Sequence, residues 1–374
     1  MRKYYLAALL LSLALFTAVR CGQQTGEEST PPQSQRVRPP ASPQVHPDGS
    51  ITFSILAPES KNVMLTVTNI PDTMQMNRDE NGIWSLTIGP LEPEIWEYSF
   101  LVDTVTCIDT QNAWIKDEPR PMMSMVEVPA DPPAFYEAQE VPHGLVTTHL
   151  FKSPVLDIWR TFKVYTPPGY DRTKPATYPV LYLLHGVAGD DKGWTTNGRA
   201  HLILDNLIAE GKAVPMIIVM PNGIYRGTGV PSDGYEQDLL NVIIPLVEKE
   251  YRVNTDPENR AIAGLSMGGQ QTLIMGFNNL DKFSWIGAFS PAYNNNAFIE
   301  TNGKNLDIAN EHLKLLWTAI GQDDTLVQRF HTLTALLDST KVKYTGAVTA
   351  GAHEWDVWRK YLRDFTQLIF RTDV

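Results

Sequence analysis

The sequence predicts an α/β domain with a mostly parallel sheet, preceded by a small all-β sandwich. Between residues 46 and 130, short apolar runs alternate with polar residues, which is typical of strands with one buried face. From about residue 160, continuous apolar runs alternate with amphipathic stretches of helical period, which indicates a parallel sheet covered on both faces. A proline-rich segment, 131–145, separates the two patterns and is predicted to be a linker.

The first 45 residues are predicted to lie outside both domains. Residues 1–20 have the parts of an export signal, because two basic residues precede an apolar run shorter than the ~20 residues of a membrane span. Cys21 stands where a bacterial lipoprotein carries its lipid, but Arg20 replaces the usual small residue, so a lipid anchor and simple cleavage both remain open. Residues 21–45 are rich in Gln, Ser, Thr and Pro, which predicts a flexible linker. We therefore expect a chain exported from a bacterial cytoplasm, whether periplasmic, an outer-membrane lipoprotein or secreted.

The first domain, 46–130, is expected to contain four main strands of an antiparallel sandwich. Turn-forming residues separate the apolar runs, notably Asp79-Glu80-Asn81-Gly82 and Gly89-Pro90. The strands are expected around residues 51–55, 63–67, 84–88 and 96–100.

The second domain, 146–374, is expected to alternate strands with helices. Strands are expected around residues 161–165, 180–184, 216–220, 260–263, 285–289, 315–320 and 343–345. Helices are expected around residues 202–210 and 236–251, after residue 268, and around 326–337 and 355–370. With two cysteines in the chain, the two hydrophobic cores rather than disulfides are expected to stabilise the fold.

Ser266 is the candidate nucleophile. It lies in Gly264-Leu265-Ser266-Met267-Gly268, between an apolar strand and a predicted helix. The two glycines permit the tight strand-to-helix turn that exposes a serine hydroxyl in α/β hydrolases. The five-residue pattern alone also occurs in ordinary turns, and it is the strand-turn-helix context that favours the catalytic interpretation.

A serine nucleophile needs a histidine base and an acid that orients the histidine. In α/β hydrolases these follow the serine in the order acid, then histidine, on loops after strands. Of the eight histidines, His353 alone meets this order on a loop, just before the last predicted helix. Asp324 is the favoured acid, and the adjacent Asp323 is the alternative.

The negative charge of the tetrahedral intermediate needs two fixed N–H donors. One is expected to be the backbone N–H of Met267, next to the nucleophile. The other is expected at Val187, in the loop that follows the strand ending near residue 184. His185, in the same loop, is expected to brace it by hydrogen bonding rather than to transfer protons.

Several other functions are disfavoured. The formal charge of −11 and the absence of a basic cluster argue against a nucleic-acid partner. His353-Glu354 begins like the helical zinc motif, but Val357 occupies the place of its second histidine. The chain has no Cys-x-x-Cys pair, phosphate loop or dinucleotide fingerprint, so neither a metal nor a cofactor is expected.

The second domain resembles the feruloyl and acetyl-xylan esterases of carbohydrate esterase family one, over about residues 143–370. The resemblance also extends to the enterochelin esterases and the antigen-85 acyltransferases, which share the Ser-Met-Gly-Gly elbow. It rests on Leu184-His185-Gly186, Asp191 with Trp194, Met220-Pro221-Asn222-Gly223, Gly264-Leu265-Ser266-Met267-Gly268-Gly269, Gly321-Gln322-Asp323-Asp324 and Gly351-Ala352-His353. The first domain resembles the early-set, immunoglobulin-like modules that precede such esterases, through Ile51-Thr52-Phe53-Ser54-Ile55-Leu56-Ala57-Pro58, Asn81-Gly82-Ile83-Trp84 and Gly89-Pro90-Leu91.

The resemblance implies a serine esterase that releases ferulate or related acyl groups from arabinoxylan, with an acylated plant polysaccharide or oligosaccharide as partner. An acetyl-xylan esterase, a siderophore esterase and a noncatalytic glycan-binding lipoprotein are the alternatives. The loop 227–234 is a candidate lid. Aromatic residues that are candidates to bind the acyl group or sugar are Trp194, Tyr235, Tyr293 and Trp355.

Overall fold

The computed structural model describes residues 38–116, 122–187, 189–223 and 234–371. Residues 39–374 form one compact unit that contains both predicted domains. The predicted export signal, Cys21 and most of the predicted linker 21–45 lie outside the described residues. Among the helices that the structure describes, none has the length and apolar character needed to span a bilayer.

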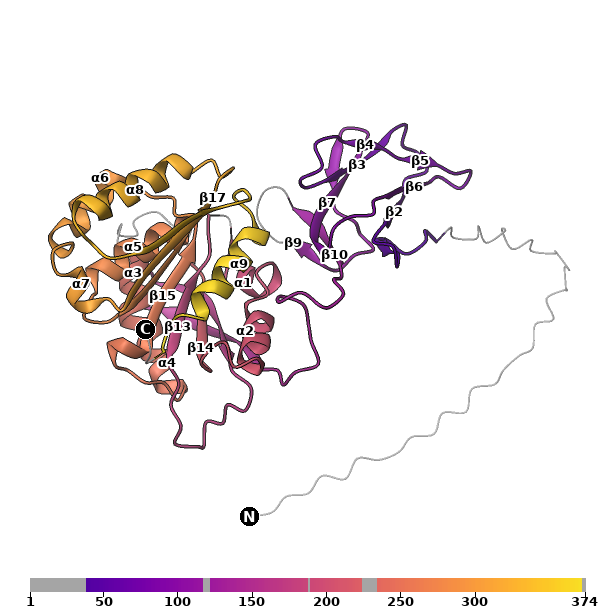
Figure 1. The fold of residues 1–374 in the computed structure, drawn as a ribbon. Helices are drawn as coiled ribbons and strands as arrows, with labels where there is room; N and C mark the ends of the chain where they lie inside the picture. The colour runs from indigo at the N-terminus through magenta and orange to yellow at the C-terminus, as the bar shows by residue number, and fades with distance from the viewer. Residues whose placement is uncertain (1–37, 117–121, 188, 224–233, 372–374) are drawn as a thin grey trace, which may run out of the picture. The chain divides into compact units, whose positions relative to one another are not determined.

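The first domain consists of antiparallel strands in two sheets around one apolar core (Figure 1). The first sheet has the order β1 (Gln44–Val45), β2 (Ile51–Leu56), β6 (Ile83–Ile88) and β5 (Asn77–Arg78). The second has the order β4 (Met74–Gln75), β3 (Val63–Val67), β7 (Glu94–Val102), β10 (Met123–Val128) and β9 (Ile115–Lys116), with β8 (Val105–Cys107) paired to β7. The four predicted strands correspond to β2, β3, β6 and β7.

Strand β10 was not expected from the sequence, and its burial explains why. Val126 and Val128 pack in the sandwich core, whereas Met125 packs in a core of the second domain. A strand covered on both faces loses the alternation of apolar and polar residues that identifies a half-buried strand.

The proline-rich segment 131–145 is packed, although the sequence predicted a linker. Tyr136 belongs to a core of the second domain. The side chain of Asn206 donates hydrogen bonds to the carbonyls of Phe135 (3.0 Å) and Glu137 (2.9 Å). The Tyr136 hydroxyl also donates to the Pro93 carbonyl of the first domain (3.4 Å), so the segment contacts both domains.

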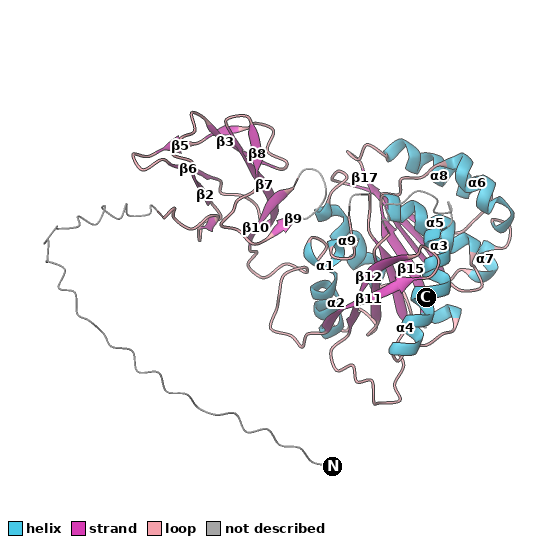
Figure 2. Cartoon of the chain, turned by 180° about the vertical axis from the view of Figure 1, so that it is seen from behind, coloured by secondary structure: helices cyan, strands magenta, loops and turns pink. Residues whose placement is uncertain are grey.

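The second domain is built on an eight-stranded sheet (Figure 2). Its order is β11 (Leu145–Ser153), β12 (Ile158–Thr166), β14 (Ile217–Pro221), β13 (Val180–Leu184), β15 (Arg260–Leu265), β16 (Trp285–Phe289), β17 (Leu315–Gly321) and β18 (Thr345–Thr349). Strand β12 is antiparallel to both neighbours, and the strands from β14 to β18 are parallel. The prediction of a mostly parallel sheet preceded by an all-β domain is confirmed.

Helices cover both faces of this sheet, so its strands are apolar throughout. In β13, Leu181 and Leu183 face one core, whereas Tyr182 and Leu184 face the other. The first core includes residues of α1 (Gly193–Thr196), α2 (Ala200–Ala209) and α9 (Trp355–Thr366). The second includes residues of α3 (Gly234–Asp238), α4 (Ile244–Glu250), α5 (Met267–Asn278), α6 (Asn295–Asn302), α7 (Ala309–His312) and α8 (Val327–Ser339).

The helix predicted at 236–251 is present as a continuous helical stretch over residues 234–250 that contains one wider turn. A π-helical turn, Leu239–Ile243, separates α3 from α4. Pro245 lies just after this turn and has no backbone N–H to donate to a preceding carbonyl. Helices α6 and α7 were not expected from the sequence, and the strand expected near residue 343 begins at Thr345.

Asp205 of α2 fixes the start of β11. Its buried carboxylate accepts hydrogen bonds from the Tyr165 hydroxyl (2.7 Å) and the Gly144 N–H (2.9 Å). The other carboxylate oxygen lies 2.9 Å from Nδ1 of His143. One buried side chain thus satisfies donors from the 131–145 segment and from β12.

Replacing Asp205 with alanine leaves these donors without their acceptor. Because an unsatisfied buried polar group costs about 1–3 kcal/mol, we expect Asp205→Ala to lower the free energy of unfolding by about 3 kcal/mol, measured by urea denaturation. Asp281→Ala is the control, because Asp281 pairs with Lys282 at an exposed site and its loss should change stability by less than about 0.5 kcal/mol. Equal stability of the two variants would contradict this role for Asp205.

Candidate active site

Ser266 lies at a sharp turn between β15 and α5. Its backbone has a positive φ of 54° with a ψ of −115°, a combination that non-glycine residues rarely adopt. The turn is held from both sides, since the Ser266 N–H donates to the Phe289 carbonyl (2.9 Å) and the Ser266 carbonyl accepts from the Ala292 N–H (2.9 Å). The predicted nucleophile therefore has the strained strand-to-helix geometry that its motif indicates.

The second glycine of the motif is required by a close backbone approach. A Cβ atom on Gly268 would lie 2.5 Å from the carbonyl oxygen of His185. Glycine at this position lets the first turn of α5 approach the end of β13 directly. The nucleophile and the loop after β13 are thereby brought together.

A chain of hydrogen bonds links Ser266, His353 and Asp324. Nε2 of His353 lies 2.9 Å from the Ser266 hydroxyl, and Nδ1 lies 2.6 Å from a carboxylate oxygen of Asp324. Because the carboxylate accepts, Nδ1 carries the hydrogen and Nε2 is free to accept the serine proton. Asp323 is exposed, whereas Asp324 is only 2% exposed, so the geometry favours Asp324 over its neighbour.

The environment of Asp324 keeps its carboxylate ionised. Burial alone would raise its pKa, but hydrogen bonds from His353 and from the Leu326 N–H (2.8 Å) bring the pKa below the ordinary value of aspartate. This pKa shift stabilises the folded state above the ordinary pKa, and the stabilisation is lost as the pH falls through the lowered pKa.

Val187 and Met267 are the predicted oxyanion donors, and each lies close to the nucleophile in the cavity or in the chain. Met267 is the first residue of α5, and the first N–H groups of a helix have no acceptor within the helix. Val187 is 71% exposed and lines the same cavity as Ser266. Their assignment as oxyanion donors remains a prediction.

His185 braces the loop that carries Val187. Its Nε2 accepts a hydrogen bond from the Gly223 N–H (2.7 Å), so Nδ1 carries the hydrogen and donates to the Gly186 carbonyl (2.7 Å). Burial, the largest effect, lowers the pKa of His185 and favours this neutral form. The contacts agree with a bracing role rather than proton transfer.

The serine and histidine open into a cavity of about 480 Å³ with walls from both domains. The second domain contributes Ser266 and His353, the loop after β13 and the start of α9. The first domain contributes residues before and along β7, and its cavity-lining residues include Thr68, Asn69, Glu92, Pro93, Trp96, Glu97 and Lys116. The sequence did not indicate that the sandwich reaches the active site.

The four aromatic candidates lie in different places. Trp355 lines the cavity, together with Trp358. Trp194 is buried and donates its indole N–H to the Leu184 carbonyl (3.0 Å). Tyr235 and Tyr293 are buried in the core on the other face of the sheet. Substrate contact stays a prediction for all four, and the candidate lid lies outside the described residues except at residue 234.

One sequence signal could have revealed the contact with the sandwich. Arg359 falls on the buried face of α9, between the apolar residues Trp358 and Leu362, and a cation there requires a partner. The structure provides Glu94 of β7 as that partner. Within the described ranges, no group of three or more histidine, cysteine or acidic side chains is arranged to hold a metal ion.

Comparison with known proteins identifies the family. A family profile described as "Putative esterase" matches residues 153–367, a region that contains the whole triad. The chain belongs to this esterase family. A protein named endo-1,4-beta-xylanase/feruloyl esterase from Xylanibacter ruminicola is 29% identical over 344 residues, which cover 88% of this chain and 46% of that protein. This member of the esterase family thus spans less than half the length of that relative.

Solved structures confirm the α/β-hydrolase fold of this esterase. A ferulic acid esterase is 29% identical with a TM-score of 0.55, and the match covers 60% of this chain and 97% of that one. A CE1 ferulic acid esterase from Anaeromyces mucronatus, solved with ferulic acid, is 26% identical with a TM-score of 0.57, covering 63% and 94%. The enterobactin esterase of Shigella flexneri has a TM-score of 0.63 over 85% of this chain and 92% of its own, and at 18% identity it shows the fold alone.

Separate substitution of the two neighbouring aspartates tests the acid. We expect Asp324→Asn to lower kcat/KM for p-nitrophenyl acetate by about 10³–10⁴-fold, because an amide no longer favours the tautomer with hydrogen on Nδ1 of His353. Asp323→Asn is the matched control and should retain kcat/KM within about twofold. A large loss from Asp323→Asn with little from Asp324→Asn would reverse the assignment.

Proposed function

We propose that this esterase releases ferulate or a related acyl group from plant cell-wall arabinoxylan through an acyl-enzyme on Ser266. The observation that carries the proposal is the hydrogen-bonded chain from Asp324 through His353 to Ser266, which opens into the cavity. These three hydrogen-bonded residues are the nucleophile, the base and the orienting acid that acyl transfer from an ester requires.

The proposed reaction has two halves. The Ser266 oxygen attacks the ester carbonyl while His353 Nε2 takes the hydroxyl proton, and Asp324 stabilises the imidazolium that forms. The N–H groups of Val187 and Met267 bind the negative oxygen of the tetrahedral intermediate. The carbon–oxygen bond to the alcohol then breaks, and His353 returns the proton to the leaving alcohol. Water repeats the sequence on the acyl-enzyme, which releases the acid and restores Ser266.

Two lines of support favour a feruloylated saccharide as the ester. Two similar solved structures are named ferulic acid esterases, and the curated relative carries feruloyl esterase in its name. The cavity also combines aromatic rings of Trp96, Trp355 and Trp358 with acidic side chains. Aromatic rings pack on flat acyl groups and sugar faces, and carboxylates accept hydrogen bonds from hydroxyls.

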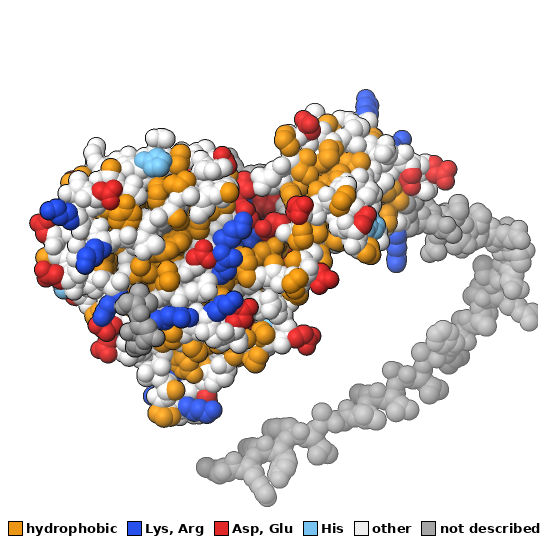
Figure 3. All heavy atoms as spheres, in the orientation of Figure 1, with side chains coloured by type: hydrophobic (Ala, Val, Ile, Leu, Met, Phe, Trp, Pro, Cys, Tyr) orange, Lys and Arg blue, Asp and Glu red, His pale blue; other side chains and the backbone are white. Residues whose placement is uncertain are grey.

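A siderophore esterase is less well supported. Among the residues that the structure describes, the cavity wall carries five carboxylate side chains, Glu92, Glu94, Glu97, Glu354 and Asp356, against two cationic ones, Lys116 and Arg359. Both cations pair with carboxylates, Lys116 with Glu97 and Arg359 with Glu94. Such a wall repels an anionic iron complex. On the face shown in Figure 3, basic side chains are interspersed with acidic and uncharged ones.

We also propose that the esterase acts outside the cytoplasm. A plant polysaccharide is met outside the cytoplasm, which agrees with the export signal predicted for residues 1–20 and the lipid anchor that remains open at Cys21. Mass spectrometry of the mature N-terminus distinguishes lipidation at Cys21 from simple cleavage.

A panel of esters tests the substrate class. The full chain should hydrolyse methyl ferulate and release ferulate from feruloylated arabinoxylan faster than it releases acetate from acetylated xylan, measured by liquid chromatography. Ser266→Ala should lower each rate by at least about a thousandfold, because it removes the nucleophile. Faster release of acetate than of ferulate would favour the acetyl-xylan alternative. Equal hydrolysis by Ser266→Ala, or none by the unmodified chain, would contradict the esterase mechanism itself.

A further inference from the structure

The catalytic histidine and the oxyanion loop are attached to two different helices. His353 lies two residues before α9, and Val187 lies in the loop that leads to α1. The two helices pack through aromatic rings, with Trp194 and Trp355 edge to face at 5.3 Å. Gly198 permits this approach, since a Cβ there would lie 2.9 Å from the Trp355 ring. The placement of α9 against α1 therefore sets where His353 lies relative to the loop of Val187.

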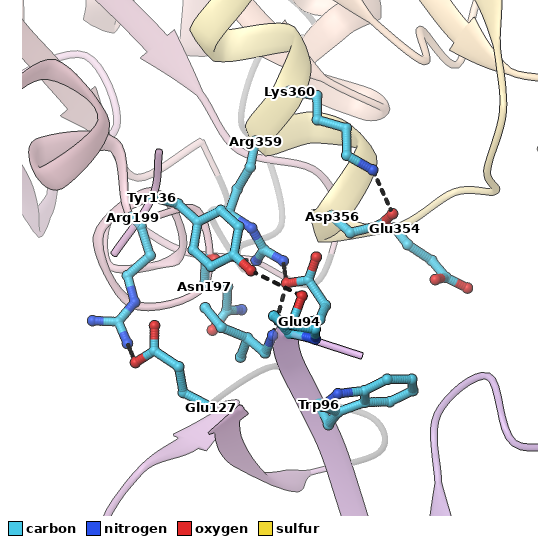
Figure 4. Close-up of polar contacts among 12 residues, drawn as sticks. Glu94, Trp96, Glu127, Tyr136, Asn197, Arg199, Glu354, Asp356, Arg359 and Lys360 are labelled. Atoms are coloured by element: carbon cyan, nitrogen blue, oxygen red, sulfur yellow. Dashed lines mark hydrogen bonds and ion pairs between the residues drawn. The ribbon is translucent and has the colours of Figure 1, made fainter. Parts of the chain in front are cut away.

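Arg359 connects these two helices by hydrogen bonds. Its side chain is only 2% exposed, and its Nη1 donates to the carbonyl of Asn197 at the end of α1 (2.8 Å). Its Nη2 donates to the carboxylate of Glu94 in β7 of the sandwich. The Tyr136 ring lies beneath the guanidinium, 4.8 Å away. Figure 4 shows Arg359 reaching from α9 to Glu94 and Asn197 together.

The buried charge of Arg359 is compensated by a residue of the sandwich. A buried guanidinium requires a compensating anion, because an uncompensated buried charge is strongly unfavourable. Glu94 provides that anion, and its same carboxylate oxygen accepts the Ile95 N–H (2.7 Å), which fixes it in place. The planar guanidinium donates in fixed directions, so it sets an orientation that packed indole rings alone leave adjustable.

A second contact from the sandwich lies beside the catalytic histidine. The side-chain amide of Asn69 donates to the carboxylate of Glu354 at 2.6 Å. Glu354 directly follows His353 in the chain and is the N-cap residue of α9. The sandwich thus holds α9 at its first turn and again at Arg359.

We infer that Glu94 and Arg359 form a positioning pair through which the sandwich sets the placement of His353 relative to the oxyanion loop. Glu94 acts through Arg359 and not on the reacting atoms. The inference depends on the geometry of the triad and is independent of which ester is the natural substrate.

Glu94→Gln removes the compensating charge and leaves the side-chain shape. We expect kcat for p-nitrophenyl acetate to fall about tenfold to a hundredfold with KM unchanged within about twofold, because small displacements of catalytic groups slow chemistry without altering the binding of a small ester. Glu127→Gln is the matched control, since Glu127 is also a sandwich carboxylate, paired with Arg199 at 3.1 Å, and Arg199 precedes α2. It should keep kcat within about twofold.

A double variant separates positioning from stability. Glu94→Gln alone should lower the melting temperature, because it leaves the buried charge of Arg359 uncompensated. Adding Arg359→Met removes that charge and fills the site with an apolar side chain of similar length, so the double variant should recover the melting temperature of the unmodified chain. Its kcat should remain low, because the bond to the Asn197 carbonyl is still absent. Recovery of kcat together with the melting temperature would overturn the inference, as would a loss confined to KM or an equal loss of kcat in Glu127→Gln.

A readout without turnover distinguishes failure of this inference from failure of the proposed function. The proton in the short bond between Nδ1 of His353 and Asp324 (2.6 Å) is expected to give a low-field NMR signal. That signal would report the position of the imidazole even if the chain hydrolyses no ester. We expect Glu94→Gln to broaden or shift this signal and Glu127→Gln to preserve it. An unchanged signal in Glu94→Gln would contradict the positioning role, whatever the result with esters.

Discussion

The site depends on one constraint, the parallel arrangement of the central strands. Parallel strands end at the same edge of a sheet, so the loops after β13, β15 and β17 and the segment after β18 meet there. Ser266 and His353 are 87 residues apart in the chain, yet their side chains form a hydrogen bond at 2.9 Å. The strained backbone of Ser266 persists because β16 accepts its N–H and Gly268 lets α5 approach β13.

The sandwich adds a second constraint on the same edge. Its strands β7 and β10 contribute residues to the cavity, to the buried pair with Arg359 and to a core of the second domain. The 131–145 segment is packed against α2 and continues this contact. A domain joined in this way differs from a module on a flexible tether, because its loss would expose apolar surface and a buried cation.

The parts that could be predicted from sequence are those encoded locally. Gly264 and Gly268 around Ser266 specify the turn within five residues, and chain order then places Asp324 and His353. The parallel sheet was predictable because strands buried on both faces are apolar throughout. The choice between Asp323 and Asp324 depends on the three-dimensional structure, because two adjacent side chains differ only in the direction each takes from the loop.

Features that depend on contacts between domains were not predicted from the sequence. Strand β10 is buried on both faces, so its sequence lacks the alternation of apolar and polar residues. The prolines of 131–145 resemble those of a free linker. The partner of Arg359 lies 265 residues earlier in the chain, and no spacing rule connects the two.

The central claim is that Ser266 is activated by His353, and covalent labelling tests it most directly. The full chain would be treated with a fluorophosphonate, which reacts with activated serines, and the adduct located by peptide mass spectrometry. The structure predicts one adduct on Ser266, with labelling strongly slowed in His353→Ala. Labelling of a different serine, no labelling, or equal labelling of His353→Ala would contradict the account.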